Sequence, residues 1–343
     1  MSVEQKFFFI ASFGSKKKHL NGESVKSRDV LSCLKEHQKV AAFNLDTYKF
    51  WNTFRFYVSA FFDRRRYVVI CKAPTGAKII LKFLKLIHYP PKQIITYIYG
   101  FGLTGEYSGK VLPADLEYCH ALIVESPEVK QQFPSEFRPE IGVFPCLKRI
   151  YTIPTDNPYE HKDVLKLLFF SRVIKSKGVL DILDATIKAN QPLVHFDLSI
   201  AGDTTAEPET NAIIQAAAEK YPFIHFLGPA FTIRGEQSYV RFSTYDLHVF
   251  PSRFFHECAP GSVIDSFIAG VPTLSTKFHS YDQMLSPSFA YFVDNSDTNL
   301  FVAALNDIYN NQPLLWSKRK LCRLEASKYS YDAFFAFFER LIS

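Results

Sequence analysis

The chain has 343 residues and a mass of 39.4 kDa, and 47% of its residues are hydrophobic. This composition excludes a disordered or low-complexity chain and predicts two domains with full cores. The net charge of +6 is unevenly spread, because residues 1–160 hold 23 Lys and Arg against 15 Asp and Glu, whereas residues 161–343 hold 17 against 19. The basic excess therefore belongs to the N-terminal half alone.

Strand-like apolar runs alternate with helical spacing along the first half. The runs cover residues 7–13, 40–45, 67–72, 94–99, 121–125 and 141–144. The first run has no small-residue cleavage site behind it, so we interpret it as a strand and not as a signal peptide. Alternation of strand and helix predicts a parallel sheet with helices on both faces. Residues 145–158 then contain three prolines and no periodicity, which is typical of a linker.

The same alternation resumes after this linker. Strand-like runs cover residues 165–170, 196–201, 224–227, 247–250 and 273–275. Aromatic and apolar residues at three-to-four spacing then predict a final helix over 329–342. We therefore predict an α/β fold of two doubly wound, Rossmann-like domains that face each other across a cleft. Their expected bounds are 1–155 and 160–328, and the helix 329–343 either closes the second domain or packs back on the first.

The segment 48–62 carries an aromatic stripe beside basic residues. The stripe consists of Phe50, Trp51, Phe54, Tyr57, Val58 and Phe61, with Phe56 on the other side. Basic residues gather nearby at 16–18, 64–66, Lys78, Lys82 and Lys85. We expect the stripe to pack into a core with a solvated basic face. The alternative is an interfacial surface that binds anionic lipid headgroups.

Several partner and compartment classes are less consistent with the sequence. No nucleic-acid-binding module accompanies the basic residues, so we expect no nucleic-acid partner. No apolar run approaches the roughly 18 to 20 residues of a membrane span. Six scattered cysteines without C-x-x-C spacing argue against a disulfide framework and against a metal site, and favour a cytoplasmic protein. The sequence is also compatible with peripheral binding to the cytoplasmic face of the membrane.

Two strand-to-helix turns in the second half carry the chemistry, because doubly wound sheets bind ligands beyond the carboxyl ends of their strands. The first turn places Arg172 and Lys177 just after an apolar run, and two cations there suit a diphosphate. The alternative is a pair of solvated loop residues.

The second turn carries Glu257, a helix that begins near Gly261, and Asp265 one turn further in. The amino end of that helix suits phosphate or sugar oxygens. The alternative is that the two acids merely favour a helix amino end.

These motifs, in order, resemble those of the retaining glycosyltransferases of the two-domain B-type fold, the "group 1" or family 4 class. Glu257, seven residues and Asp265 resemble the E-x7-E element, and Gly270-Val271-Pro272 resembles its G-x-P element. Ser171-Arg172 and Lys177-Gly178 resemble the G-R…K-G clamp, and Gly202 and Gly228 end two further matching strands. The resemblance covers roughly residues 164–276. Asp265 replaces the commoner Glu, and Ser171 the usual Gly.

The resemblance implies a role for each matching residue. Arg172 and Lys177 would neutralise the departing nucleotide diphosphate without a metal or other cofactor, and Glu257 would contact the transferred sugar. Asp265 would hold the ribose hydroxyls, and the N–H groups of Gly261 and Ser262 would face sugar or phosphate. The strand-end glycine Gly202 is expected in the donor site.

The first domain fits this pattern more loosely. Gly14 and Gly22 resemble the glycine-containing loop in which the backbone approaches the donor or acceptor, although an ordinary turn explains them equally well. The glycines at 100, 102 and 105 follow another strand, but the helix and acidic partner of a dinucleotide fingerprint are missing. We therefore exclude an oxidoreductase function for this chain.

The resulting hypothesis is an enzyme that moves a sugar from a nucleotide-diphosphate sugar to a glycan or lipid-linked acceptor in surface polysaccharide assembly. One alternative is a non-catalytic module that docks on a membrane or partner. The other is a nucleotide-sugar epimerase or a phosphorylase on the same fold.

Overall fold

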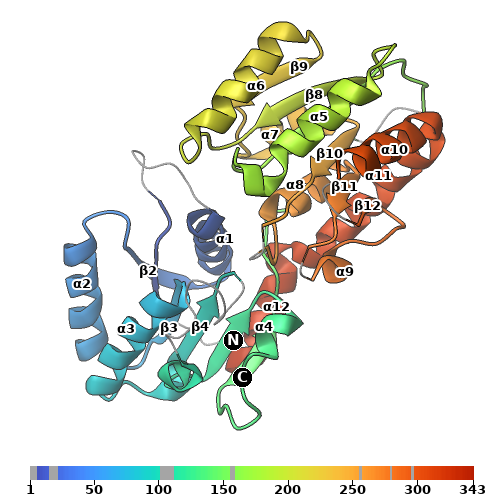
Figure 1. Cartoon of the computed structure of the whole chain (residues 1–343). Coiled ribbons are helices and arrows are strands. Elements are labelled where there is room, and N and C mark those ends of the chain that lie inside the picture. The colour runs from blue at the N-terminus through green and yellow to red at the C-terminus, as the bar shows by residue number, and fades with distance from the viewer. Residues whose placement is uncertain are drawn as a thin grey trace. The chain divides into compact units, whose positions relative to one another are not determined.

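The structure is a computed structural model, and two compact units divide the chain (Figure 1). The first unit consists of residues 1–149 and 329–343, and the second unit of residues 150–328. The residues that the structure describes are 6–14, 22–100, 112–154, 159–254, 257–278, 280–294 and 297–343.

The first unit is built on a six-stranded parallel sheet with the order β2-β1-β3-β4-β5-β6. Its strands are β1 (Lys6–Ala11), β2 (Lys39–Asn44), β3 (Tyr67–Lys72), β4 (Ile94–Ile98), β5 (Ala121–Val124) and β6 (Glu140–Val143). All side chains of β4 are buried, as expected of a strand between two helical layers. The chain order reverses between β1 and β3, which pair in register from Phe7 opposite Tyr67.

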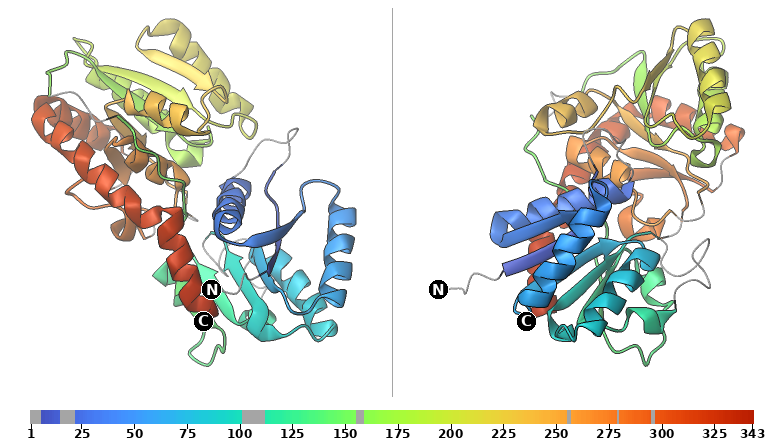
Figure 2. Two further views of the ribbon diagram at one scale, coloured as in Figure 1. Left: turned by 180° about the vertical axis from the view of Figure 1, so that it is seen from behind. Right: turned by 90° about the vertical axis from the view of Figure 1, so that its left-hand side faces the viewer.

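Helices cover both faces of this first sheet. One face packs against α1 (Gly22–His37) and α12 (Tyr331–Ile342), and the other against α2 (Lys49–Phe62) and α3 (Pro74–Leu86). The short helices are η1 (Pro91–Gln93), η3 (Pro113–Leu116) and α4 (Pro127–Lys130). The Phe338 ring of α12 lies 5.9 Å from the Phe7 ring of β1. Figure 2 shows α12, in red, lying along this sheet, so the last helix belongs to the core of the first unit.

The aromatic stripe of α2 does not enter a core. Phe50, Trp51 and Phe54 are 84%, 57% and 49% exposed, whereas Phe56, from the other side of the helix, is fully buried. The Phe56 ring packs 6.3 Å from the Phe8 ring of the sheet. The expectation of a core stripe is therefore wrong, because the sheet needs only the narrow face of α2 that carries Phe56 and Ala60.

The second unit is built on another six-stranded parallel sheet, with the order β12-β11-β10-β7-β8-β9. Its strands are β7 (Leu165–Phe170), β8 (Phe196–Ala201), β9 (Ile224–Gly228), β10 (Leu247–Phe250), β11 (Thr273–Thr276) and β12 (Ala290–Val293). Within this unit the chain begins with β7 at the middle of the sheet and continues outward through β8 to β9. It then returns with β10 to the other side of β7. The reversal of strand order therefore falls between β7 and β10.

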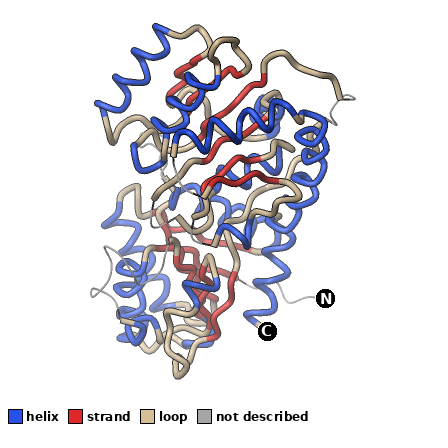
Figure 3. Tube along the Cα trace, turned by 45° about the vertical axis from the view of Figure 1, so that its right-hand side comes forward, coloured by secondary structure: helices blue, strands red, loops and turns tan. Residues whose placement is uncertain are grey.

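The helices of the second unit flank both faces of its sheet (Figure 3). They are η4 (Lys175–Lys177), α5 (Val179–Ala189), α6 (Pro208–Lys220), α7 (Glu236–Ser243), α8 (Gly261–Ala269), α9 (Tyr281–Met284), α10 (Thr298–Asn310), α11 (Gln312–Ala326) and η5 (Ser327–Tyr329), the last of which reaches into the first unit. Residues of α5 and α10 join β7, β8 and β10 in one buried cluster, and α8 packs against α7 and α11. The predicted α/β class, with two doubly wound parallel sheets, is confirmed.

Candidate functional site

Two turns of the second unit meet where its strand order reverses. The turn after β7 covers residues 171–178, and the turn after β10 covers residues 251–260. Because β7 and β10 pair directly in parallel, with Leu247 opposite Leu167, their carboxyl ends lie side by side. In doubly wound sheets this edge is the place where ligands bind. The structure thus brings together the two motifs that the sequence singles out.

Gly178 brings the backbones of these two turns into contact. It has a φ of +72°, and a Cβ atom at this position would lie 2.0 Å from the carbonyl oxygen of Pro251. The Arg253 N–H also donates to the carbonyl oxygen of Ser176 at 2.9 Å. Only glycine permits both the left-handed conformation and this approach. The glycine of the K-G pair therefore fixes the distance between the turns.

Lys177 and Glu257 form an ion pair across this contact. Both side chains are largely buried, and the Lys177 ammonium donates directly to Oε2 of Glu257. The Ser252 hydroxyl donates to the same oxygen at 3.0 Å. In a buried environment each charge requires the other, because an unpaired one would be strongly disfavoured. The two residues are thus mutually dependent parts of one site.

Arg172 lies on the exposed side of the same site. Its guanidinium carbon is 5.2 Å from the centroid of the Phe254 ring, and Lys177 Nζ is 4.6 Å from that centroid. Two cations from the turn after β7 therefore gather around one aromatic ring from the turn after β10. Cations held this way suit a ligand with several negative oxygens, such as a diphosphate.

Asp265 is buried in α8, away from solvent. Its Oδ1 atom accepts a hydrogen bond of 2.7 Å from the hydroxyl of Tyr239 in α7, and the Tyr239 ring lies 5.4 Å from that of Tyr151. Gly261 and Ser262 form the half-exposed first turn of α8. Tyr239 was not predicted as a site residue from the sequence, because no motif connects α7 with the turn that follows β10.

Gly202 shapes the edge of the sheet at the end of β8. It has a φ of +140°, and a Cβ atom there would lie 1.6 Å from the carbonyl oxygen of Ser171. A side chain would therefore push away the turn that carries Arg172. This packing requirement explains the glycine without a ligand, and a donor contact by Gly202 stays a prediction.

The glycines predicted in the first unit lie at its first strand-to-helix connection. The Gly14 N–H donates to Oδ2 of Asp46 at 2.7 Å, so this amide is already engaged within the protein. Gly22 begins α1 in open space. Residues 15–21, with the basic residues 16–18, and residues 101–111, with the glycines at 102 and 105, lie outside the described residues.

Charged side chains gather at the carboxyl edge of the first sheet, which the sequence did not single out. Lys72, the last residue of β3, lies 3.0 Å from Glu23, and Lys26 pairs with the buried Glu125 that follows β5. Glu125 Oε2 also accepts from the Gly100 N–H at 2.7 Å. The available signal was their position directly after strands. These groups can hydrogen-bond a polar ligand.

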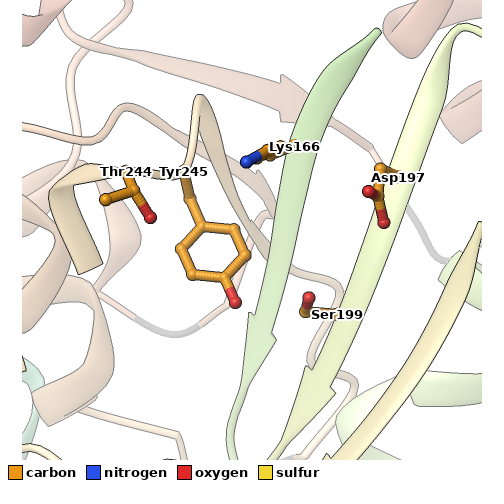
Figure 4. Close-up of a pocket in the computed structure, with 5 residues that line it drawn as sticks. All are labelled: Lys166, Asp197, Ser199, Thr244 and Tyr245. Atoms are coloured by element: carbon orange, nitrogen blue, oxygen red, sulfur yellow. The ribbon is translucent and has the colours of Figure 1, made fainter. Parts of the chain in front are cut away.

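A separate polar cavity of about 130 Å³ lies in the second unit (Figure 4). It is lined by Lys166, Asp197, Ser199, Thr244 and Tyr245. Lys166 and Asp197 are the second residues of β7 and β8, so the cavity lies near the amino ends of these strands. It is therefore remote from the two turns and does not belong to the candidate site.

The structure has neither a metal-ligand cluster nor a membrane-spanning helix among its described residues. In the part of the chain that it describes, no group of three or more His, Cys, Asp or Glu residues could hold a metal ion. None of the described helices is long and apolar enough to cross a membrane. All six cysteines are free and buried, and burial raises the pKa of the Cys71 and Cys119 thiols to about 12.

No family model and no curated protein matches the sequence, but solved structures match the fold. HepE from Anabaena, solved with UDP-glucose, has a TM-score of 0.71 and 13% identity, over 96% of this chain and 97% of its own. Sucrose-phosphate synthase from Thermosynechococcus elongatus has a TM-score of 0.71 and 15% identity, over 98% of each chain. The fold is that of the B-type glycosyltransferases.

The pneumococcal O-GlcNAc transferase GtfA, solved with UDP and GlcNAc, also matches, with a TM-score of 0.65 and 13% identity. The match covers 85% of this chain and 59% of GtfA. At such identities the likeness concerns the B-type fold and not individual residues. Within this B-type fold, the cations, Glu257 and Asp265 all belong to the second unit.

Proposed function

We propose that the chain is a retaining glycosyltransferase that moves a sugar from a nucleotide-diphosphate sugar to a glycan or lipid-linked acceptor. The supporting observation is the cluster of Arg172, Lys177 and Glu257 around Phe254, at the carboxyl edge where strand order reverses. The B-type fold agrees with this proposal, because HepE was solved with UDP-glucose and GtfA with UDP and GlcNAc.

In the proposed reaction the bond between sugar C1 and the diphosphate oxygen breaks, and its electron pair leaves with the nucleotide diphosphate. The acceptor hydroxyl oxygen bonds to C1 on the same face, and its proton passes to the departing phosphate. Arg172 and Lys177 stabilise the charge that develops on the diphosphate. The Lys177 ammonium has three N–H donors, so it can bind phosphate while it keeps Glu257.

Two cations at this position supply the charge stabilisation that a metal ion would otherwise provide, so we propose transfer without a metal. Full activity in the presence of EDTA is expected. Loss of activity in EDTA that Mg²⁺ or Mn²⁺ restores would contradict this part of the proposal. We further propose a role in surface polysaccharide assembly, in a reducing compartment that suits the six free thiols.

Donor binding is tested by thermal shift with UDP-, GDP-, CDP- and ADP-linked sugars, because a ligand of the folded state raises the melting temperature. One nucleotide class is expected to raise it. Arg172→Ala should weaken that binding at least ten-fold without changing the melting temperature of the protein alone. Lys175→Ala, which removes an exposed cation of the same turn, is the matched control and should bind normally. No shift with any nucleotide sugar would refute the proposal.

The products separate this function from the alternatives on the same fold. A transferase forms product only when acceptor is present, whereas an epimerase changes the sugar nucleotide without one. A phosphorylase requires inorganic phosphate. The anomeric configuration of the product, read by NMR from the coupling at C1, tests retention, and an inverted product would overturn it.

A further inference from the structure

The exposed aromatic face of α2 is a feature that the proposed function does not use. Trp51, Phe54, Val58 and Phe61 follow one another at spacings of three, four and three residues, which places them on one side of the helix. All four are exposed. Phe50 and Phe62 extend this set at the two ends, with 84% and 80% exposure. We call these six residues the α2 face.

The position of α2 in the first unit leaves this face uncovered. Helix α2 lies at the margin of the unit, and none of the described helices and strands of that unit lies on its outer side (Figures 1 and 2). Its inner side packs on the sheet through Phe56 and on α3 through Tyr57, whose ring stacks 3.7 Å from that of Phe83. Contiguous apolar surface of this kind marks an interaction site.

The charges around the α2 face favour an anionic partner. Residues 48–66 contain five Lys or Arg and one acid, Asp63. That carboxylate is 2.6 Å from Arg66 Nε, so an internal cation already neutralises it, and hydrogen bonds from Arg66 hold its pKa below the usual range. Lys49, Arg55, Arg64 and Arg65 are exposed. Lys82 and Lys85 of α3 add two more exposed cations.

A second copy of this chain would not match that charge. Two α2 faces packed against each other would bring Arg55 and Arg64 of both copies together, and α2 itself has no acid to pair with them. A bilayer matches both properties. Aromatic rings enter the boundary between headgroups and acyl chains, while flanking cations attract anionic headgroups.

We infer that the α2 face docks on the surface of an anionic phospholipid bilayer, with α2 lying in the plane of the interface. The Arg64 guanidinium already lies 5.3 Å from the Phe61 ring, so its charge can stay among the headgroups while the ring enters. This inference needs no catalytic activity. It therefore stands or falls independently of the proposed function.

Trp51 provides a reporter near the amino end of this surface. The chain has two tryptophans, Trp51 and Trp316, so in the Trp316→Phe variant the tryptophan fluorescence comes from the α2 face alone. This variant is titrated with vesicles of phosphatidylcholine and with vesicles that contain phosphatidylglycerol as well. We expect a blue shift and quenching by brominated lipid with the anionic vesicles, and at least ten-fold weaker binding to the neutral ones.

Two variants in this background test the two components of the surface. Phe50→Ser with Phe54→Ser and Phe61→Ser removes apolar side chains, and Lys49→Gln with Arg55→Gln and Arg64→Gln removes charge. Each should weaken binding to anionic vesicles at least ten-fold without lowering the melting temperature. The matched control replaces exposed apolar residues of the second unit, Ile213, Leu300 and Leu324, by Ser, and should bind within two-fold of the parent.

Three results would overturn the inference. One is equal binding of the aromatic variant and its parent to anionic vesicles, and another is equal affinity for neutral and anionic vesicles. The third is a parent that binds no vesicles but sediments as a dimer that the aromatic variant dissociates, because the α2 face would then join two copies of the chain.

Discussion

Helices α2 and α12 are both rich in aromatic residues, but α12 buries most of them whereas α2 exposes most of them. Helix α12 buries Tyr331, Phe334, Phe338 and Leu341 in the core of the first unit. Helix α2 buries only Phe56 and Ala60 and exposes its apolar stripe. The comparison teaches that periodicity predicts which residues share a face of a helix, whereas the surrounding fold decides whether anything covers that face.

The charged residues of the second unit repeat this contrast. Lys177 and Arg172 belong to one turn and lie near one aromatic ring, but Lys177 is buried against Glu257 and Arg172 is exposed. Substitutions at the buried positions, in the core face of α12 or at Lys177, should therefore lower the free energy of unfolding. Substitutions at the exposed positions, in the α2 face or at Arg172, should affect only binding or activity.

The largest effect is expected from Phe338→Ala in α12. It removes a fully buried ring that packs 5.9 Å from Phe7, and such truncations cost about 3 to 5 kcal/mol of unfolding free energy. Phe54→Ala in α2 should cost less than about 0.5 kcal/mol. Urea denaturation measures both, and equal losses would mean that α2 is covered in solution.

Lys177→Ala should cost nearly as much, because it leaves the carboxylate of Glu257 buried without its partner. Loss of one member of such a pair costs about 3 to 5 kcal/mol. The double variant Lys177→Met with Glu257→Gln should recover most of the loss in thermal denaturation. No recovery would show that the pair is not coupled.

A smaller effect is expected from His248, which is fully buried in β10. Burial lowers its pKa from 6.5 to about 3, so the folded protein holds it neutral while the unfolded chain protonates it below 6.5. The free energy of unfolding should therefore fall as pH decreases from 6.5 toward 3, by about 2 kcal/mol at pH 5 from this group. His248→Phe should flatten this part of the pH profile. An unchanged profile would assign the loss to other groups.

The smallest effect is expected from Tyr239→Phe, which removes the hydrogen bond to the buried Asp265. A hydrogen bond to a charged group contributes about 1.5 to 3 kcal/mol, and we expect a loss near the lower value. Tyr221→Phe, at a half-buried position, is the control and should change stability by less than about 0.5 kcal/mol. Equal effects in calorimetry would argue against a special role for Tyr239.

Much of the fold follows from local pattern. The apolar run 67–72 coincides with β3, and the spacing of Tyr331, Phe334 and Phe338 correctly predicts a helix. Strand β12 was missed, because it lies at the edge of the sheet, has four residues, and buries only its two ends. Its residues are all apolar, but the run is shorter than the six-residue strands β7 and β8 and so gives a weaker signal.

The candidate site was predictable in location but not in its pairings. The motifs place Lys177 and Glu257 after two strands, yet their contact depends on the close approach of Gly178 to Pro251. Tyr239 reaches Asp265 from a helix that carries no motif. Both contacts join segments far apart in the sequence, and local sequence patterns do not predict which distant segments come into contact.

The return of the chain to its first unit has a consequence for synthesis on the ribosome. The strands of that unit are made first, but α12, which completes their core, follows the whole second unit in the chain. The face of the sheet that Phe338 covers therefore lacks α12 until about 180 further residues after Arg149 have been synthesised. At about 5 to 20 residues per second this delay lasts on the order of 10 to 40 seconds. The domain that begins first is thus the one that finishes last.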